Sequence, residues 1–246
     1  MKDNFSGHAA EYASFRPGYP PQVFQLIEQL VPERRACWDV GTGNGQLAGK
    51  LADLFDHVYA TDISARQLLH AVQTDNIRYS VQPAERTNFP DGIFDLVTVA
   101  QAIHWFDFAR FYEEVRRTCR PRAILLVTGY GLATAGKDLD AIVYRLYEGI
   151  VGPYWDPERR YILEEYRTIP FPFDEITVPD LSIECRWTLE QMLGYLRTWS
   201  AVRHYHEHHG HDPVQRIEAD LRAAWPATTH CRVTFPLLMR AGRVGP

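Results

Sequence analysis

Residues 37–46 read CWDVGTGNGQ, and this stretch decides the fold because an apolar run ends there in three alternate glycines. Residues 36–40 are typical of a buried strand, and the apolar residues of 47–55 then recur at helical spacing. A strand that turns through glycines into a helix is typical of an open parallel sheet, which binds ligands at the carboxyl ends of its strands. Glycine also lets the backbone approach a ligand closely. We therefore predict a ligand site at this turn.

The spacing of the glycines differs from that of a dinucleotide-binding turn. The pattern G-x-G-x-x-G places its last glycine where this chain has Gln46. Asp39 also stands two residues before the first glycine. Its carboxylate would repel a pyrophosphate but could accept hydrogen bonds from an ammonium group, directly or through water. The pattern favours a cofactor that carries an amino-acid moiety instead of a diphosphate.

A second acid, Asp62, ends the next predicted strand, residues 57–61. An acid about 20 residues after the turn is the usual acceptor for the two ribose hydroxyls. Together the two acids describe a nucleoside bound through its ribose, with a zwitterionic tail over the glycine turn. The alternative for the glycines is a tight strand–helix turn without a ligand.

At this point the sequence resembles the class I S-adenosylmethionine-dependent methyltransferases. The first motif of that family, an acid followed by G-x-G-x-G, matches residues 39–45, and its ribose acid matches Asp62. Its adenine-side segment looks like residues 84–85 followed by 89–97. Within the family, Y-x-x-x-R-P-x-Y-P at 12–20 and QAIHWFD at 101–107 look like the type 11-like, small-molecule branch that includes trans-aconitate methyltransferase-like proteins.

The resemblance implies a cofactor, S-adenosyl-L-methionine, and its product, S-adenosyl-L-homocysteine. We expect the following residues to bind it: Arg16, Asp39, Gly41, Thr42, Gly43, Asn44, Gly45, Asp62, Ile63, Gln67, Ala84, Glu85 and Gln101. Asp39 and the glycine turn would hold the methionine end, Asp62 the ribose, and Ala84 the edge of the adenine. Gln67 is about equally expected to be a surface polar residue.

Residues 101–105 would form the floor beneath the methyl group. His104 could take a proton from an acceptor hydroxyl or amine, or it could be a packed core residue, since methylating a carboxylate needs no base. Trp105 could shield the sulfonium, although core packing is the simpler role. Tyr12 and Arg16 could fold over the cofactor as a lid, with Arg16 clamping a carboxylate of the cofactor or of the acceptor.

The resemblance also implies an α/β Rossmann-like fold, with a seven-stranded, mostly parallel sheet and an antiparallel last strand. Helices would cover both faces, and a helical lid would be inserted. We expect one methyltransferase domain over 1–246, with an N-terminal cap and first helix (1–35), a cofactor-binding core (36–130), a helical lid (131–180) and a closing β-α-β portion (181–246). Residues 169–174, IPFPFD, predict a loop, because alternate prolines remove backbone donors. A last strand is expected over 231–239, with Pro236 at an edge or bulge.

Composition excludes several classes of protein. The 246 residues carry 26 basic and 31 acidic side chains, so the basic excess of a nucleic-acid binder is missing. No apolar run approaches the ~18 residues of a membrane span, and the four cysteines are scattered singly, which favours a cytoplasmic protein. We expect no metal: His204, His208 and His211 could share a helix face, but Gly210 breaks it.

The sequence therefore predicts a cytoplasmic enzyme that methylates a small organic acceptor, with a carboxylate or a hydroxyl as the expected site of O-methylation. N- or C-methylation of a small metabolite is an alternative. So are a cofactor-binding module without turnover and an enzyme of the NAD or nucleotide-sugar type. The chain could be a monomer or a dimer.

Overall fold

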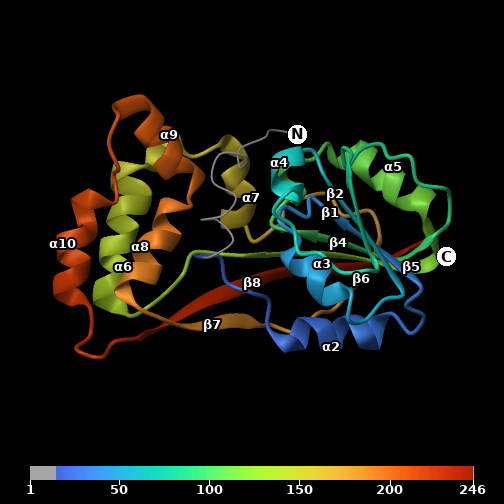
Figure 1. Cartoon of the computed structure of the whole chain (residues 1–246), viewed down its shortest axis with the longest axis horizontal. Helices are drawn as coiled ribbons and strands as arrows, with labels where there is room; N and C mark the ends of the chain where they lie inside the picture. Colours follow the sequence, from blue (N-terminus) through green and yellow to red (C-terminus); the bar gives the residue numbers. More distant parts are fainter. Residues whose placement is uncertain (1–14, 246) are drawn as a thin grey trace.

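The computed structural model describes residues 15–245, so Tyr12 lies outside the described residues. Its centre is a sheet in which seven strands follow the order β3-β2-β1-β4-β5-β8-β6, with an eighth strand, β7, paired to β8 (Figure 1). Five strands are parallel: β1 (Ala36–Val40), β2 (His57–Asp62), β3 (Ile77–Val81), β4 (Phe94–Ala100) and β5 (Cys119–Tyr130).

The last strand, β8 (Cys231–Val244), runs antiparallel to β5. Two shorter strands, β6 (Asp174–Ile176) and β7 (Ser182–Trp187), in turn pair antiparallel with β8. The predicted fold class is confirmed. The last strand extends five residues beyond the predicted end at 239, because pairing with β5 continues to Val244. Pro236 lies where β8 passes from β7 to β5, at the point where a missing backbone N–H is tolerated.

Helices cover both faces of the sheet, as its continuous burial requires. α2 (Pro21–Leu30) and α3 (Gln46–Leu51) cover one face, where they pack on Ile124 and Leu126 of β5. α5 (Phe108–Thr118) covers the other face and packs on Leu125 and Val127. Because successive strand residues point to opposite faces, the same strand serves both layers.

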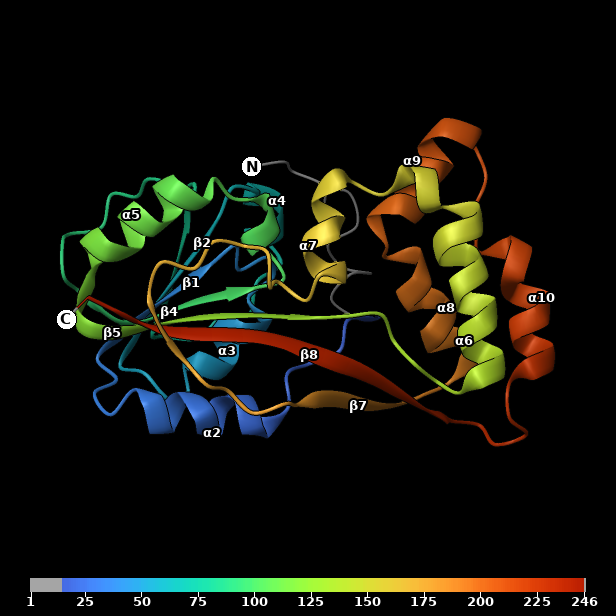
Figure 2. The same ribbon diagram turned by 180° about the vertical axis from the view of Figure 1, so that it is seen from behind.

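A helical lobe lies at the end of the sheet opposite the C-terminus (Figure 2). It contains α6 (Lys137–Tyr144), which continues through a π-helical segment (Arg145–Ile150), α8 (Leu189–Arg197), α9 (Ser200–His209) and α10 (Gln215–Ala224). One apolar cluster joins these helices, so the lobe draws on both sides of residue 180. α8 begins at a capping box between Thr188 and Gln191.

Several shorter elements complete the fold. They are α4 (Ala65–Leu68), the 3-10 turns Ile103–Trp105, Gly152–Tyr154 and Pro157–Arg159, and α7 (Arg160–Leu163). In both views α7 lies between the core and the lobe (Figures 1 and 2). The chain between residues 170 and 173 has no regular structure, and the predicted loop ends where β6 begins at Asp174.

Candidate active site

The glycine turn after β1 has left-handed backbone torsions. Gly43 has φ +58°, and a Cβ added there would meet nothing within 4 Å, so the space above the turn is open. Gly45 has φ +76°, and a Cβ there would lie 2.3 Å from the hydroxyl of Tyr79. Gly45 is therefore required by packing below the turn, whereas Gly43 borders open space on the side where a ligand would lie.

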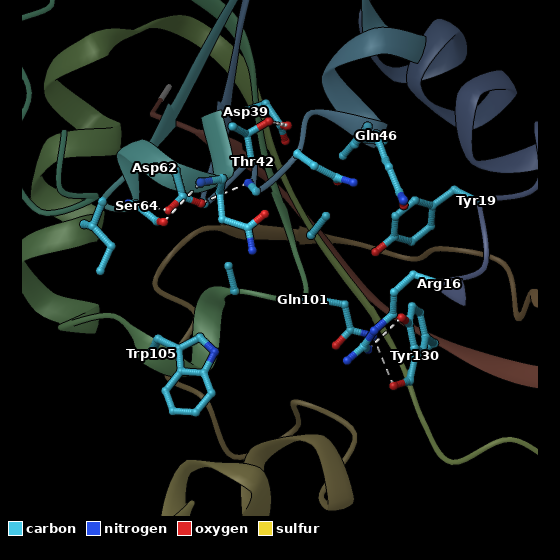
Figure 3. A pocket seen from close by; sticks show the side chains of 18 of the residues that line it. Arg16, Tyr19, Asp39, Thr42, Gln46, Asp62, Ser64, Gln101, Trp105 and Tyr130 are labelled. Atoms are coloured by element: carbon cyan, nitrogen blue, oxygen red, sulfur yellow. Dashed lines mark hydrogen bonds between the residues drawn. The ribbon is translucent and has the colours of Figure 1, made fainter. Parts of the chain in front are cut away.

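The two acids lie on the same side of the molecule, at the carboxyl ends of neighbouring strands (Figure 3). Asp39 Oδ2 accepts a hydrogen bond from Thr42 Oγ1 at 2.5 Å, and Oδ1 accepts one from Thr98 Oγ1 at 2.7 Å. Asp62 accepts from the backbone N–H groups of Gly43 at 2.9 Å and Ser64 at 2.8 Å. The turn and both acids thus form one hydrogen-bonded unit.

The pKa of Asp39 is raised to about 6. Burial is the main cause, the charge of Asp62 acts in the same direction, and the hydrogen bonds from Thr42 and Thr98 act in the opposite direction. Asp39 is only 1% exposed. No cation pairs with it among residues 15–245, and a buried carboxylate in that position attracts a positive charge strongly because little solvent screens it. Asp39 therefore gives the floor of the turn an affinity for a cation such as an ammonium group.

The unit opens into a cavity at the carboxyl ends of the strands. Ten of the predicted cofactor residues line it: Arg16, Asp39, Gly41, Thr42, Gly43, Asn44, Asp62, Ile63, Gln67 and Gln101. Gly45, Ala84 and Glu85 do not. Ala84 is buried in the core, and Glu85 Oε1 accepts the backbone N–H of Asp107 at 3.1 Å, at the start of α5.

Sequence reasoning missed several residues that line this cavity. They are Pro17, Tyr19, Gln46, Leu47, Ser64, Ala100 and Tyr130. Tyr19 belongs to the motif at 12–20, and Tyr130 ends β5. The rule that ligands bind at strand ends could have found Tyr130, as it found Asp62. Ser64 accepts the N–H of Gln67 and so begins α4.

Arg16 lies at the border of this cavity. Its Nη1 donates to Tyr130 Oη at 2.9 Å (Figure 3). Its Nη2 donates to the carbonyl oxygen of Thr198 at 3.4 Å. The guanidinium also lies 5.7 Å from the ring centre of Tyr195. Beside it, Gln101 has a left-handed φ of +57° and donates through Nε2 to the carbonyl of Tyr130 at 3.3 Å. These contacts connect the sheet edge to the end of α8.

A second cavity adjoins the first and lies between the sheet edge and the helical lobe. The two share four lining residues: Arg16, Gln101, Trp105 and Tyr130. The second is also lined by His104, Gly131, Trp155, Asp156, Arg159, Ile162, Tyr195, Trp199 and Ser200. Its walls are therefore largely aromatic, with two guanidinium groups.

Arg159 is the second of these cations. Its guanidinium lies 4.7 Å from the ring centre of Trp155, and its Nε donates to Tyr147 Oη at 3.2 Å. Within residues 15–245 no carboxylate forms an ion pair with it, and Asp156, on the same wall, lies 4.0 Å from His204 Nδ1. Arg159 is consequently available to an anion that enters this cavity.

His104 is 6% exposed and lines the second cavity only. Burial lowers its pKa to about 3, and the positive charge of Arg159 contributes to this. Its Nδ1 lies 3.5 Å from Tyr166 Oη, and its ring centre lies 4.8 Å from that of Trp105. The imidazole is therefore neutral at physiological pH and is a weak base.

The histidines of the lobe do not share one complete helix face. α9 ends at His209, with Gly210 in a left-handed cap, so His211 lies beyond the helix. In the described part of the chain, no three His, Cys, Asp or Glu residues are grouped so that they could hold a metal ion. No helix there is both long and apolar enough to cross a membrane.

Comparison with known proteins decides the family. A family model described as the methyltransferase domain matches residues 38–127, which include the glycine turn and both acids. A Dictyostelium discoideum protein, provisionally named a methyltransferase, is 34% identical over 245 residues, which cover 96% of this chain and 93% of that protein. The chain belongs to the class I S-adenosylmethionine-dependent methyltransferases.

Solved structures agree with this family. A provisionally named type II methyltransferase from Anaeromyxobacter dehalogenans matches the methyltransferase described here with 42% identity and a TM-score of 0.87, covering 94% of this chain and 99% of that one. A Haemonchus contortus phosphoethanolamine N-methyltransferase in complex with S-adenosyl-L-methionine matches with 18% identity and a TM-score of 0.50. The match covers 98% of this chain and 57% of that one. The latter similarity concerns the fold alone.

The cofactor of the methyltransferase is S-adenosyl-L-methionine, with S-adenosyl-L-homocysteine as the product. The cavity fits such a molecule, because open space lies over Gly43 and buried acids line the floor and the neighbouring strand end. Membership of the family excludes the NAD and nucleotide-sugar alternatives. The names of the Dictyostelium and Anaeromyxobacter relatives specify no acceptor, so the trans-aconitate-like branch stays a prediction.

Proposed function

We propose that this methyltransferase esterifies a carboxylate of a small organic acid that binds in the second cavity. The observation that carries the proposal is the pair of guanidinium groups, Arg16 and Arg159, on the walls of a cavity that adjoins the cofactor cavity. Guanidinium groups bind carboxylates through two parallel hydrogen bonds. The resemblance to the trans-aconitate-like branch favours the same acceptor class.

The cofactor side is served by the two acids. We assign Asp39 to the ammonium group of the methionine end, which its buried charge attracts, and Asp62 to the ribose hydroxyls. Asp62 already accepts two backbone N–H groups, which hold its carboxylate in a fixed orientation at the cavity wall. A fixed acceptor loses less conformational entropy when the cofactor binds than a mobile one would.

S-adenosyl-L-methionine supplies a methyl group that a sulfonium makes electrophilic, so the protein has mainly to align the acceptor and exclude water. In the transfer, a carboxylate oxygen forms the new C–O bond while the methyl–sulfur bond breaks, and no proton has to be removed. Holding two reactants in line can supply ~7–11 kcal/mol of the barrier. Arg159 also keeps the acceptor ionised, because a nearby cation favours the carboxylate form.

The state of His104 supports a carboxylate over a hydroxyl acceptor. A hydroxyl has to lose a proton when it is methylated, and an effective general base has a pKa near the working pH. The pKa of His104 is lowered to about 3, so His104 is poorly suited to that role. A carboxylate acceptor makes no such demand.

The test is methyl transfer to defined acceptor classes. The full chain is incubated with S-adenosyl-L-methionine labelled in its methyl group and with separate pools of carboxylic acids, alcohols and amines. Esters release labelled methanol in mild alkali, whereas ethers and methylamines do not. We expect alkali-labile label from the acid pool. Alkali-stable label from the alcohol or amine pool would contradict the proposal.

A further inference from the structure

Tyr166, which follows α7, is held in an uncommon backbone conformation. Glu165 has φ +53° and Tyr166 has φ +60°, so two successive residues with side chains adopt the left-handed region. Arg240 Nη1 donates to the carbonyl oxygens of Tyr166 at 3.2 Å and Ile169 at 2.7 Å, which fixes this turn to β8. Strained residues of this kind persist where the surrounding structure holds them, and they gather at functional sites.

The sheet leaves room for the Tyr166 side chain at one glycine. A Cβ on Gly129 of β5 would lie 2.5 Å from Tyr166 Oη. The ring is fully buried and stacks on the imidazole of His104, with centroids 6.2 Å apart and an interplanar angle of 26°. Its hydroxyl lies 3.5 Å from His104 Nδ1, which is its single hydrogen-bond partner within residues 15–245.

The direction of this hydrogen bond follows from what each group can donate. A neutral imidazole has one N–H and one bare nitrogen. If Nδ1–H donated to the phenol oxygen, the buried hydroxyl proton of Tyr166 would have no acceptor, which is costly. If the hydroxyl donates instead, its proton and the bare Nδ1 are both satisfied, and the imidazole proton must be on Nε2.

We propose that Tyr166 is a positioning residue that fixes His104 as the Nε2–H tautomer, so that Nε2–H donates a hydrogen bond to the acceptor in the second cavity. Nδ1 is occupied by Tyr166 and the ring lines that cavity, which leaves Nε2 for a ligand. Towards a carboxylate, this tautomer presents a donor, whereas the Nδ1–H tautomer would present a lone pair. Its assignment to the acceptor rests on the proposed function.

The neutral state of His104 agrees with this role. Burial and the charge of Arg159 lower the pKa of His104 to about 3, so the ring keeps a single proton over the working range of pH. Arg159, Trp105 and Tyr166 are the charged and aromatic groups that act on the ring from the elements packed around it. A neutral donor can orient a carboxylate without taking a proton from solvent.

Nitrogen NMR of the full chain, labelled with ¹⁵N-histidine and saturated with S-adenosyl-L-homocysteine, tests the tautomer directly. The His104 signals are identified by their loss in His104→Gln. We expect a protonated Nε2 and a bare Nδ1 from pH 6 to 9. A protonated Nδ1 in the wild-type protein would overturn the proposal, whatever the variants do.

Tyr166→Phe removes the donor, and Tyr112→Phe is the matched control. Tyr112 is also buried in the same apolar cluster, but its hydroxyl donates to the carbonyl of Pro170. In Tyr166→Phe the two nitrogen signals of His104 should move towards each other as the tautomers mix, while Tyr112→Phe leaves them unchanged. Unchanged signals in a folded Tyr166→Phe protein would contradict the role of Tyr166.

Gly129→Ala offers a second route if Tyr166→Phe fails to fold. The added methyl group should displace the Tyr166 hydroxyl and mix the tautomers in the same way, and unchanged signals there would count against the proposal. The NMR measurement needs no acceptor, so it is independent of the methyl-transfer test. A fixed Nε2–H tautomer without ester formation would reject the proposed function alone, and ester formation with a protonated Nδ1 would reject the role of Tyr166 alone.

Discussion

Gly43 donates its backbone N–H to Asp62 Oδ2 at 2.9 Å, which fastens the acid that ends β2 to the turn that follows β1. The same turn carries Thr42, whose hydroxyl donates to Asp39. The two acids are therefore held by one loop, and a change in either should affect cofactor binding first.

Asp62→Ala should weaken the binding of S-adenosyl-L-homocysteine about 10- to 100-fold. It removes a charged hydrogen-bond acceptor, and such bonds contribute about 1.5–3 kcal/mol. His104→Ala should change the affinity far less, because His104 lines only the second cavity. Titration calorimetry of both variants checks the order, and a larger loss in His104→Ala would contradict our assignment.

Asp39→Asn should stabilise the cofactor-free protein above pH 6. Burial raises the pKa of Asp39 to about 6 from an unfolded value near 3.8, so the folded state binds this proton more tightly. Wild-type stability from this group is therefore present below pH 3.8 and is lost as the pH rises through 6. The difference corresponds to about 3 kcal/mol at most.

Urea unfolding at pH 5 and pH 8 measures this effect. We expect a gain of about 1–3 kcal/mol for Asp39→Asn at pH 8 and a smaller gain at pH 5. Asp53→Asn is the control, since Asp53 is an exposed acid beyond the end of α3. An equal gain in the free energy of unfolding at both values of pH would show that the effect does not come from ionisation of Asp39.

Cofactor affinity should depend on pH through the same group. Protonation of Asp39 removes the charge that attracts the ammonium group, so the Kd for S-adenosyl-L-homocysteine should rise about tenfold between pH 7 and pH 5. In Asp39→Asn the affinity should be lower and nearly independent of pH over this range. A wild-type Kd that stays constant down to pH 5 would show that Asp39 does not bind the cofactor through its charge.

Arg159→Met should raise the KM for an acidic acceptor about 10- to 100-fold while leaving the cofactor Kd unchanged, because hydrogen bonds to charged groups are worth about 1.5–3 kcal/mol. Arg160→Met is the matched control, since its guanidinium contacts Tyr161 and does not line either cavity. Steady-state kinetics with the best acid from the methyl-transfer screen measures both. Equal effects of the two substitutions would argue against a role in acceptor binding.

Gly45→Ala should destabilise the protein by about 2–4 kcal/mol, from a left-handed backbone and a steric clash together. The new methyl group would lie 2.3 Å from the Tyr79 hydroxyl, which donates to the Val72 carbonyl at 2.6 Å. Gly92→Ala isolates the backbone effect, because Gly92 has φ +64° and no atom near the added carbon. Chemical denaturation of both variants separates the two costs; equal losses would show that the clash is relieved.

The cofactor half of the molecule could be predicted from the sequence for a physical reason. Parallel strands buried on both faces are continuous apolar runs, and acids at the ends of neighbouring strands have to lie together. Asp39 and Asp62 therefore follow from local patterns alone. Arg16 was found through its motif, and the structure places it on the border of two cavities.

The second cavity could not be predicted in this way. Arg159 and Tyr195 come from segments more than 30 residues apart, and only the packing of the lobe brings them to one wall. The role of Tyr166 could not be predicted, because its conformation depends on Arg240 and on the space beside Gly129. The last residues of β8 carry no clear strand pattern, and pairing with β5 determines their structure.

The position of Arg16 has a consequence for how the two ligands bind. One guanidinium borders the donor compartment and the acceptor compartment, and it also holds the last turn of α8 through the carbonyl of Thr198. A ligand that moves this guanidinium changes the charge and the contacts that the other site offers. The affinities for cofactor and acceptor are therefore linked, and the linkage is reciprocal. Bound cofactor should therefore change the affinity for the acceptor, and bound acceptor the affinity for the cofactor, before any methyl transfer takes place.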